Sequence, residues 1–183
     1  MGHRTLVAYD RDGYDLHYAH WGVDPDALTA ETPFGGRPED CWARDRAEGL
    51  LDAEGGRLTE SPDIAVEADP IATGVSFVDI GGHVDPIEHE ALYVVREDFS
   101  VRTYLVFGLE GHAIGSGDGP AVALVGYDGD ADASHLRGWL AGARAVRGVS
   151  GPDDGAIVRA LRWLDPGRGT VVWLSGPAER ASG

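Results

Sequence analysis

Residues 4–21 read RTLVAYDRDGYDLHYAHW, and this stretch predicts a β-hairpin almost at the start of the chain. Leu6–Tyr9 forms the first predicted strand and Tyr14–Trp21 the second. Asp12 and Gly13 between them favour a tight turn, because glycine adopts a positive φ without steric cost. The second strand gathers two tyrosines, two histidines and a tryptophan. The hairpin is therefore the predicted start of the sheet, and its second strand is rich in polar and aromatic side chains.

The rest of the chain alternates between predicted strands, loops and helices. Strands are expected at Ala91–Arg96, Val101–Leu109, Ala121–Tyr127 and Thr170–Leu174, and helices at Pro38–Glu54, Asp132–Arg147 and Pro152–Leu164. Loops are expected at Val23–Arg37, Arg57–Ile71 and Gly111–Pro120. Residues 76–90 are ambiguous, because Ser76 and Asp79 are spaced like a capping box while Gly81 and Gly82 disfavour a long helix.

This order of elements predicts an α+β fold. Hairpins followed by paired helices indicate an antiparallel or mixed sheet, built from two β-hairpins plus further strands, with helices packed on one face. A chain of 183 residues with 43% hydrophobic residues can bury the core of one domain. We expect a single domain over residues 1–175 and a flexible tail over residues 176–183.

The charge composition is unusual, with 31 acidic residues against 15 basic ones and a net charge of -16. Every basic residue is arginine, since the sequence contains no lysine. Carboxylates hold water and hydrated cations, and at ~1 M salt the Debye length is about 3 Å, so their mutual repulsion is screened. We therefore expect a halophilic protein. An ordinary acidic protein from a GC-rich genome is the alternative.

Several partner classes and compartments are disfavoured. A nucleic-acid partner is not expected, because no cluster of neighbouring arginines offers a basic face. Cys41 is the single cysteine, so no intrachain disulfide can form. No apolar run approaches the ~18 residues of a membrane span, and the first residues lack the apolar region of a signal peptide. We expect a cytoplasmic protein with a protein or small-molecule partner.

Two segments of the first strand pair carry a resemblance to a known family. MGHRTLVAY at residues 1–9 and YDLHYAHWG at residues 14–22 resemble a haloarchaeal family of unknown function with the pattern MGHRxLVAY…YxLHYxHWG. TPFGG at residues 32–36 and HEALYVV at residues 89–95 are similar to later blocks of that family. The likeness covers mainly residues 2–110. It implies a salt-adapted cytoplasmic protein and assigns no activity and no catalytic residues.

Histidines and carboxylates supply the candidate site. They gather in two segments, comprising His17 and His20 in the first and His83, Asp85, Glu88, His89 and Glu90 in the second. Imidazole and carboxylate together suit a divalent metal such as Zn²⁺ or Mn²⁺. Strand alternation places His17 and His20 on opposite faces, so a shared ion needs a bulge or a strand end between them. Otherwise these residues are ordinary polar groups at strand ends.

The predicted site residues fall into two overlapping sets. The ligand-binding set is His17, Tyr18, His20, Trp21 and His89, and the metal set is His17, His20, His83, Asp85 and His89. Two other motifs are weaker. The run Asp128–Asp132 starts like a calcium loop, but Ala133 and Trp139 replace its required glycine and glutamate. Gly115–Gly119 precedes a strand and lacks the lysine of a P-loop.

Two functions follow from these sets. The favoured one is a non-catalytic binding or regulatory domain that presents the aromatic and histidine-bearing hairpin. The alternative is a small metal-dependent hydrolase whose histidines and a carboxylate activate water. The first is preferred because no complete catalytic set can be assembled from the sequence. A concave cluster of ligating side chains favours the hydrolase, and an exposed aromatic patch favours the binding domain.

Overall fold

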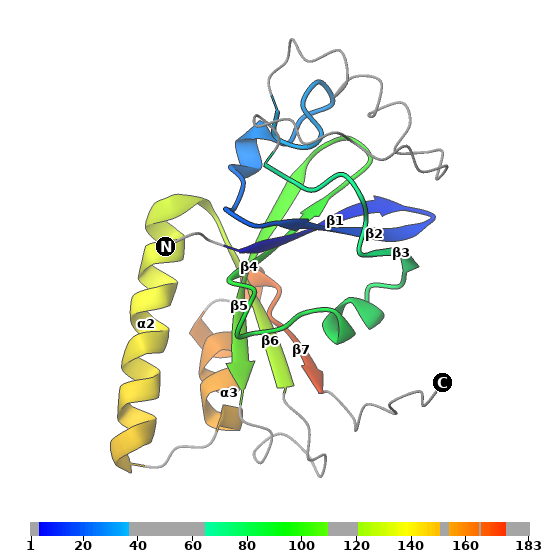
Figure 1. Cartoon of the computed structure of the whole chain (residues 1–183). Helices are drawn as coiled ribbons and strands as arrows, with labels where there is room; N and C mark the ends of the chain where they lie inside the picture. Colours follow the sequence, from blue (N-terminus) through cyan, green and yellow to red (C-terminus); the bar gives the residue numbers. More distant parts are fainter. Residues whose placement is uncertain (1–3, 37–64, 110–120, 151–153, 165, 175–183) are drawn as a thin grey trace, which may run out of the picture. The chain divides into compact units, whose positions relative to one another are not determined.

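The computed structural model of the chain describes residues 4–36, 65–109, 121–150, 154–164 and 166–174 (Figure 1). It divides into two compact units, which we describe separately. The first comprises Met1–Ile80 and Glu88–Thr103, and the second Gly81–Ile87 and Tyr104–Gly183. The predicted helix at residues 38–54, the loop at residues 111–120 and the tail lie outside the described residues. The single domain over residues 1–175 stays a prediction.

The first unit is built on the predicted hairpin. Strand β1 (Thr5–Arg11) pairs antiparallel with β2 (Gly13–Ala19), and β2 pairs antiparallel with β3 (Ala72–Val75). On its other side, β1 pairs parallel with β4 (Ala91–Val95). In this unit the strands follow the order β3-β2-β1-β4-β5, where β5 is Val101–Leu109 and continues into the second unit. The sheet is therefore mixed, as the sequence allowed.

The hairpin turn depends on one glycine. Gly13 has φ 115°, and a Cβ placed on it would lie 2.8 Å from the backbone carbon of Gly74. Gly74 in turn donates its N–H to the Asp15 carboxylate, at 3.0 Å. β3 was not predicted, because its four residues include this glycine and follow directly after a proline-containing stretch. Its close approach to the hairpin explains why glycine is needed at position 13.

Gly13→Ala is expected to destabilise the protein by about 1–3 kcal/mol from backbone strain, and by more once β3 must move away. Gly74→Ala is the matched control, since its φ is 64° but a Cβ there meets nothing within 4 Å. Urea melts at fixed salt concentration measure both losses. Equal losses for the two variants would contradict the close approach of β3 to the turn.

Two loops cover one side of β2. A short 3-10 helix, η1 (Pro25–Ala27), is capped by Asp24, and the loop then closes where the Thr32 hydroxyl donates to the oxygen of Ala27 at 2.7 Å. Residues 65–71 follow β2 through backbone bonds from Glu67 N to Tyr18 O, 2.8 Å, and from Ile71 N to Leu16 O, 2.7 Å. These bonds fix the segment beside the strand.

The second unit carries the helices. β6 (Ala121–Tyr127) pairs antiparallel with β7 (Val171–Leu174) in the order β5-β6-β7, and α2 (Gly129–Ser150) and α3 (Asp154–Leu164) lie beside them (Figure 1). One buried cluster joins them, comprising Leu105, Phe107, Ala123, Val125, Ala133, Leu136, Leu140, Ile157, Val158 and Leu161. The strand residues alternate along β5 and β6, so both helices pack on the same face. The predicted α+β fold is confirmed.

The ambiguous segment resolves into a short helix and turns. Ser76 accepts from the N–H of Asp79 at 3.4 Å and donates its hydroxyl to the Asp79 carboxylate at 2.6 Å, just before the 3-10 helix η2 (Asp79–Gly82). The predicted capping arrangement is present, but the two glycines limit the helix to one turn. No helix in the described residues has the length and apolarity needed to cross a membrane.

Candidate functional site

His17 is an interior residue. It is 1% exposed, and its ring lies 5.1 Å from that of Tyr9 and 5.6 Å from that of Phe34, between centroids. Its Nδ1 lies 2.8 Å from the backbone oxygen of Glu67. A carbonyl oxygen only accepts, so Nδ1–H is the donor. This bond holds residues 65–71 against β2, so His17 has a structural role.

Tyr9 belongs to the same interior cluster. Its hydroxyl donates to the backbone oxygen of Pro33, and its ring lies 5.8 Å from that of Phe34. Burial raises the pKa of the Tyr9 hydroxyl well above its usual value, so the group stays protonated at neutral pH. Together Tyr9, His17 and Phe34 hold the covering loop against the sheet.

Four other ring-bearing residues meet where β2 ends. The ring centroid of Tyr18 lies 5.9 Å from that of His20 and 5.8 Å from that of His89, and His20 lies 4.6 Å from Trp21. All three contacts are edge-to-face, the arrangement that ring quadrupoles favour. We call Tyr18, His20, Trp21 and His89 the aromatic surface. All four belong to the first unit.

The end of β2 explains how these side chains are presented. Gly22 has φ 77° and donates its N–H to the oxygen of Ala19 at 3.3 Å, which closes a reverse turn with His20 and Trp21 at its centre. Turn side chains point away from the backbone bond, and Trp21 is 78% exposed. A further bond, from Glu90 N to Arg4 O at 2.8 Å, holds the segment of His89 beside the start of β1.

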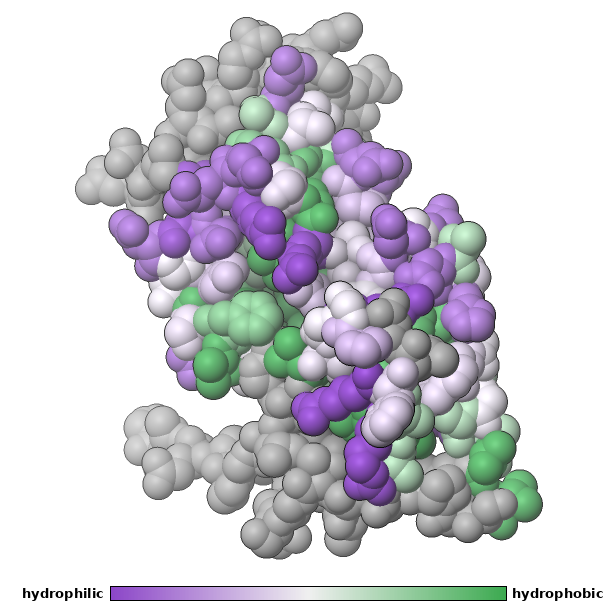
Figure 2. Space-filling model, turned by 180° about the vertical axis from the view of Figure 1, so that it is seen from behind, coloured by the Kyte–Doolittle hydropathy of each residue, from purple (hydrophilic) through white to green (hydrophobic). Residues whose placement is uncertain are grey.

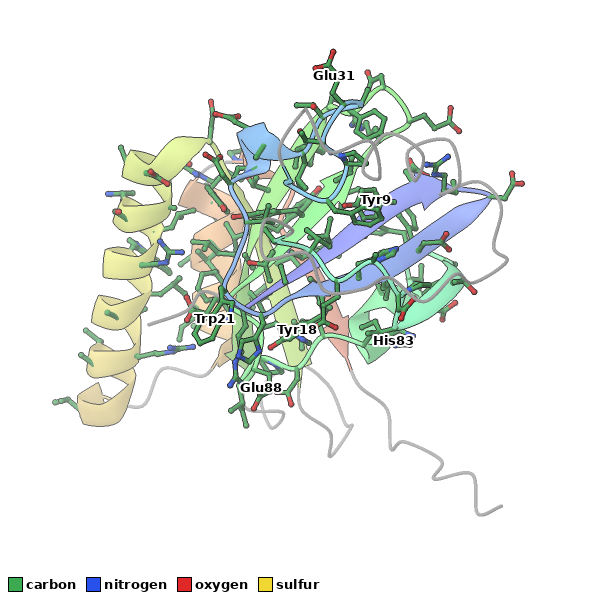
Figure 3. The ribbon with its side chains drawn as sticks, turned by 45° about the horizontal axis from the view of Figure 1, so that its top comes forward. Tyr9, Tyr18, Trp21, Glu31, His83 and Glu88 are labelled. Carbon is green, nitrogen blue, oxygen red and sulfur yellow. The ribbon has the colours of Figure 1, made fainter. Side chains whose placement is uncertain are left out.

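Charged groups border the aromatic surface. Arg4 and Glu88 form an ion pair with half-exposed side chains, and Glu67 and Glu90 are exposed. Figure 3 shows Trp21, Tyr18 and Glu88 gathered in one region of the first unit. The Glu88 carboxylate next to His89 in the sequence is therefore already paired with the Arg4 guanidinium. An exposed ion pair contributes little to stability, about 0–1 kcal/mol, so its arrangement matters more for the local potential than for folding.

The predicted metal set is not brought together. Within the described residues, no three histidine, cysteine or carboxylate side chains lie close enough to hold a metal ion. His17 is buried in the interior cluster, whereas His20 and His89 are on the aromatic surface. His83 and Asp85 belong to the second unit, where Asp85 accepts from the N–H of Ile87 at 2.8 Å. The geometry gives the metal hypothesis no support.

A second polar cluster lies in the second unit. Arg168 donates through Nη2 to the Asp132 carboxylate at 2.8 Å, through Nη1 to the other carboxylate oxygen, and to the oxygen of Gly126 at 3.3 Å. Asp132 also accepts from the N–H of Asp128 at 3.0 Å. A Cβ at Gly126 would lie 2.2 Å from the oxygen of Arg168. The calcium-like run therefore supplies an arginine clamp that ties the 3-10 helix η4 (Pro166–Arg168) to β6 and α2.

The Arg168 hydrogen bond lowers the pKa of Asp132 below its usual value. The ion pair of Asp132 with Arg168 therefore stabilises the fold fully above the pKa of the unfolded state, about 3.9. This contribution is lost as the pH falls through the lower pKa of the folded state. Asp132→Asn is expected to cost about 0.5–1 kcal/mol at pH 7 and less near pH 3. Urea melts at both pH values measure this, and a loss that stays constant with pH would contradict the ion pair.

Comparison with known proteins identifies the family of the chain. Residues 1–172 match the model of a family of unknown function, DUF6735. The chain belongs to this family. The match spans the aromatic surface and the arginine clamp alike. No curated protein and no solved structure matches the chain.

The site of this DUF6735 protein agrees with the sequence prediction only in part. Tyr18, His20, Trp21 and His89 of the ligand-binding set lie together, while His17 lies elsewhere because strand alternation turns it inward. Sequence reasoning missed the bordering Arg4. The only available signal was its position directly before the first strand, which is too general to mark a site.

The exposed apolar groups of the second unit have a different character. Val146, Val149 and Trp163 are 55%, 89% and 86% exposed. The apolar end of α2 is visible at the lower right of Figure 2. No ring contact within the described residues joins Trp163 to another aromatic side chain, in contrast to Trp21. The aromatic surface is therefore the better candidate site of the DUF6735 protein.

Proposed function

We propose that the protein is a non-catalytic binding or regulatory domain that presents the aromatic surface to a protein or small-molecule partner. One observation carries this proposal. Trp21 is 78% exposed, yet its ring is held in a continuous series of edge-to-face contacts through His20 and Tyr18 to His89. Leaving a large aromatic side chain in water forgoes the gain from burying it. Fixed aromatic rings with polar atoms are typical of binding surfaces.

The metal-dependent hydrolase is the weaker function. Activation of water by a metal needs several ligands around one ion. The described residues hold no such group, and His17, one member of the predicted metal set, is committed to the interior. No observation favours the hydrolase over the binding domain, so we do not propose it.

The same proposal includes the environment in which the protein acts, a salt-rich cytoplasm. A salt-rich cytoplasm fits the net charge of -16 and the use of arginine as the sole basic residue. Hydrophilic side chains cover much of the face drawn in Figure 2. A partner must then be bound by contacts that survive molar salt, which favours aromatic stacking over long-range charge attraction.

A thermal-shift screen of small molecules and short peptides, run in molar salt, tests the proposed function. The wild type is compared with Trp21→Ala and with Trp163→Ala, which removes a similarly exposed tryptophan from α3. Ligands that raise the melting temperature of the wild type and of Trp163→Ala are expected to lose that effect on Trp21→Ala. Ligands that stabilise all three proteins equally would contradict the proposal.

A further inference from the structure

The outward face of α2 carries no charge, which is unusual for an exposed helix of an acidic protein. A set of exposed residues recurs along α2 at spacings of three and four, so they lie on one face, opposite the buried Leu136 and Leu140. These exposed residues are Ala131, Ser134, Gly138, Ala141, Gly142, Ala145, Gly148 and Val149. None of them is charged, although 25% of the chain is. The side of a helix that faces solvent is ordinarily charged or polar, so this face has the composition of a contact surface.

The C-terminal half of this face is apolar and open to close approach. Val149 is 89% exposed, and Val146 beside it is 55% exposed. Glycine in a helix interior disfavours the helix, yet a Cβ at Gly138 or Gly142 would meet nothing within 4 Å. The fold of this chain therefore does not require glycine at either position. Glycine there allows the backbone of another chain to approach α2 closely.

Two arginines border the charge-free face on one side. Arg137 and Arg144 are seven residues apart, which places both on the same flank of α2, and both are exposed. Neither forms an ion pair with another residue in the described part of the chain. The helix holds no acidic residue from Ala133 to Ser150, although the chain has 31. The flank is therefore positively charged within an acidic protein, and its two guanidiniums can pair with carboxylates from another molecule.

We infer that the outward face of α2, together with Arg137 and Arg144, docks a helix of a partner protein that is acidic along one flank. Small and apolar side chains of the partner helix pack on the charge-free face, and its carboxylates pair with the two guanidiniums. This surface belongs to the second unit, whereas the aromatic surface belongs to the first, so the inference does not depend on the proposed function.

A second copy of the chain fits this face less well. Antiparallel pairing of two α2 helices brings the same flanks together, and Asp130 then lies opposite Arg144 only in a register that also brings the two Arg137 side chains together. Parallel pairing sets the arginine flank against the other flank, where the nearest carboxylate, Asp132, is already bonded to Arg168. Charge complementarity therefore favours a different, acidic partner.

An NMR titration of the isotopically labelled protein in molar salt tests the inference. The probes are a capped helical peptide of three heptads, with alanine and leucine at its contact positions and glutamate on its flanks, and the same peptide with lysine on its flanks. The glutamate peptide is expected to shift the amide resonances of Gly138, Ala141 and Gly142. The lysine peptide should bind about two- to tenfold more weakly, which is the value of two exposed ion pairs.

Charge reversal separates this docking from general attraction to an arginine-bearing surface. Arg137→Glu combined with Arg144→Glu should make the protein prefer the lysine peptide. The matched control, Arg102→Glu combined with Arg162→Glu, changes the net charge equally at exposed arginines outside α2 and should keep the preference for the glutamate peptide.

Gly142→Leu tests the face itself. A side chain there meets nothing within 4 Å, so the melting temperature should not fall, but the leucine occupies the contact and peptide binding should be lost. The inference is overturned by equal binding of the two peptides, by an unchanged preference after reversal of Arg137 and Arg144, or by full binding to Gly142→Leu. A dimer in sedimentation velocity that Gly142→Leu dissociates would also overturn it, because a second copy would then cover the face.

Discussion

Transfer from molar salt to less than ~0.2 M salt is expected to expand or unfold the protein. The chain holds 31 acidic residues against 15 basic ones, and folding brings those carboxylates close together. At ~1 M salt the Debye length is about 3 Å, while at ~0.1 M it is about 10 Å, so neighbouring carboxylates repel one another much more strongly in the dilute solution. The folded state therefore loses stability as salt is removed.

Circular dichroism and melting temperature across a salt series measure this dependence. Sodium chloride and potassium chloride should act alike if screening is the cause, and sucrose at matched osmolarity should not substitute for either. A melting temperature that stays constant from molar to low salt would show that the acidic composition is not an adaptation to salt.

Leu140→Ala is expected to lower the free energy of unfolding by about 2–5 kcal/mol, which is the range for emptying a buried leucine site. Leu140 is 4% exposed and lies in the cluster that joins α2 and α3 to β5 and β6. The matched control is Val146→Ala on the same helix, which is 55% exposed and should cost less than about 0.5 kcal/mol. If denaturant melts give equal losses of unfolding free energy for the two variants, Leu140 does not lie on the buried face of α2.

Much of the fold could be predicted because its elements follow simple periodicities. The Asp12-Gly13 pair between two strand-forming segments predicted the first hairpin, and apolar runs predicted Val101–Leu109 and Ala121–Tyr127 with the bounds observed. Leu136 and Leu140 recur at helical spacing and are buried. The helical spacing reports one buried face, whereas the apolar runs report strands buried on both faces, as Val122–Val125 are.

What escaped prediction depends on tertiary contacts. β3 is an edge strand of four residues without hydrophobic alternation, and its Gly74 lies close to Gly13 of the hairpin turn. The partnership of Asp132 with Arg168 joins residues far apart in the sequence, and no local spacing indicates it. Neither relation leaves a local signal in the chain.

The parts of the candidate site that depend on local sequence could be predicted, and the parts that depend on tertiary contacts could not. Strand alternation separated His17 from His20 correctly, because it is a local property. Side-chain chemistry placed Tyr18 and His89 in one candidate set, whereas their contact depends on β4 pairing parallel with β1, which brings residue 89 to the end of β2. A sequence shows which side chains are chemically able to form a site, but not which of them the sheet order brings together.

The chemical-shift footprint of the strongest stabilising ligand, mapped on the isotopically labelled protein in molar salt, tests the central claim most directly. The account predicts that the largest changes fall on the side-chain resonances of Tyr18, His20, Trp21 and His89, with the indole of Trp163 unmoved. The opposite pattern, in which the indole of Trp163 shifts and that of Trp21 does not, would contradict the assignment of the aromatic surface as the binding site.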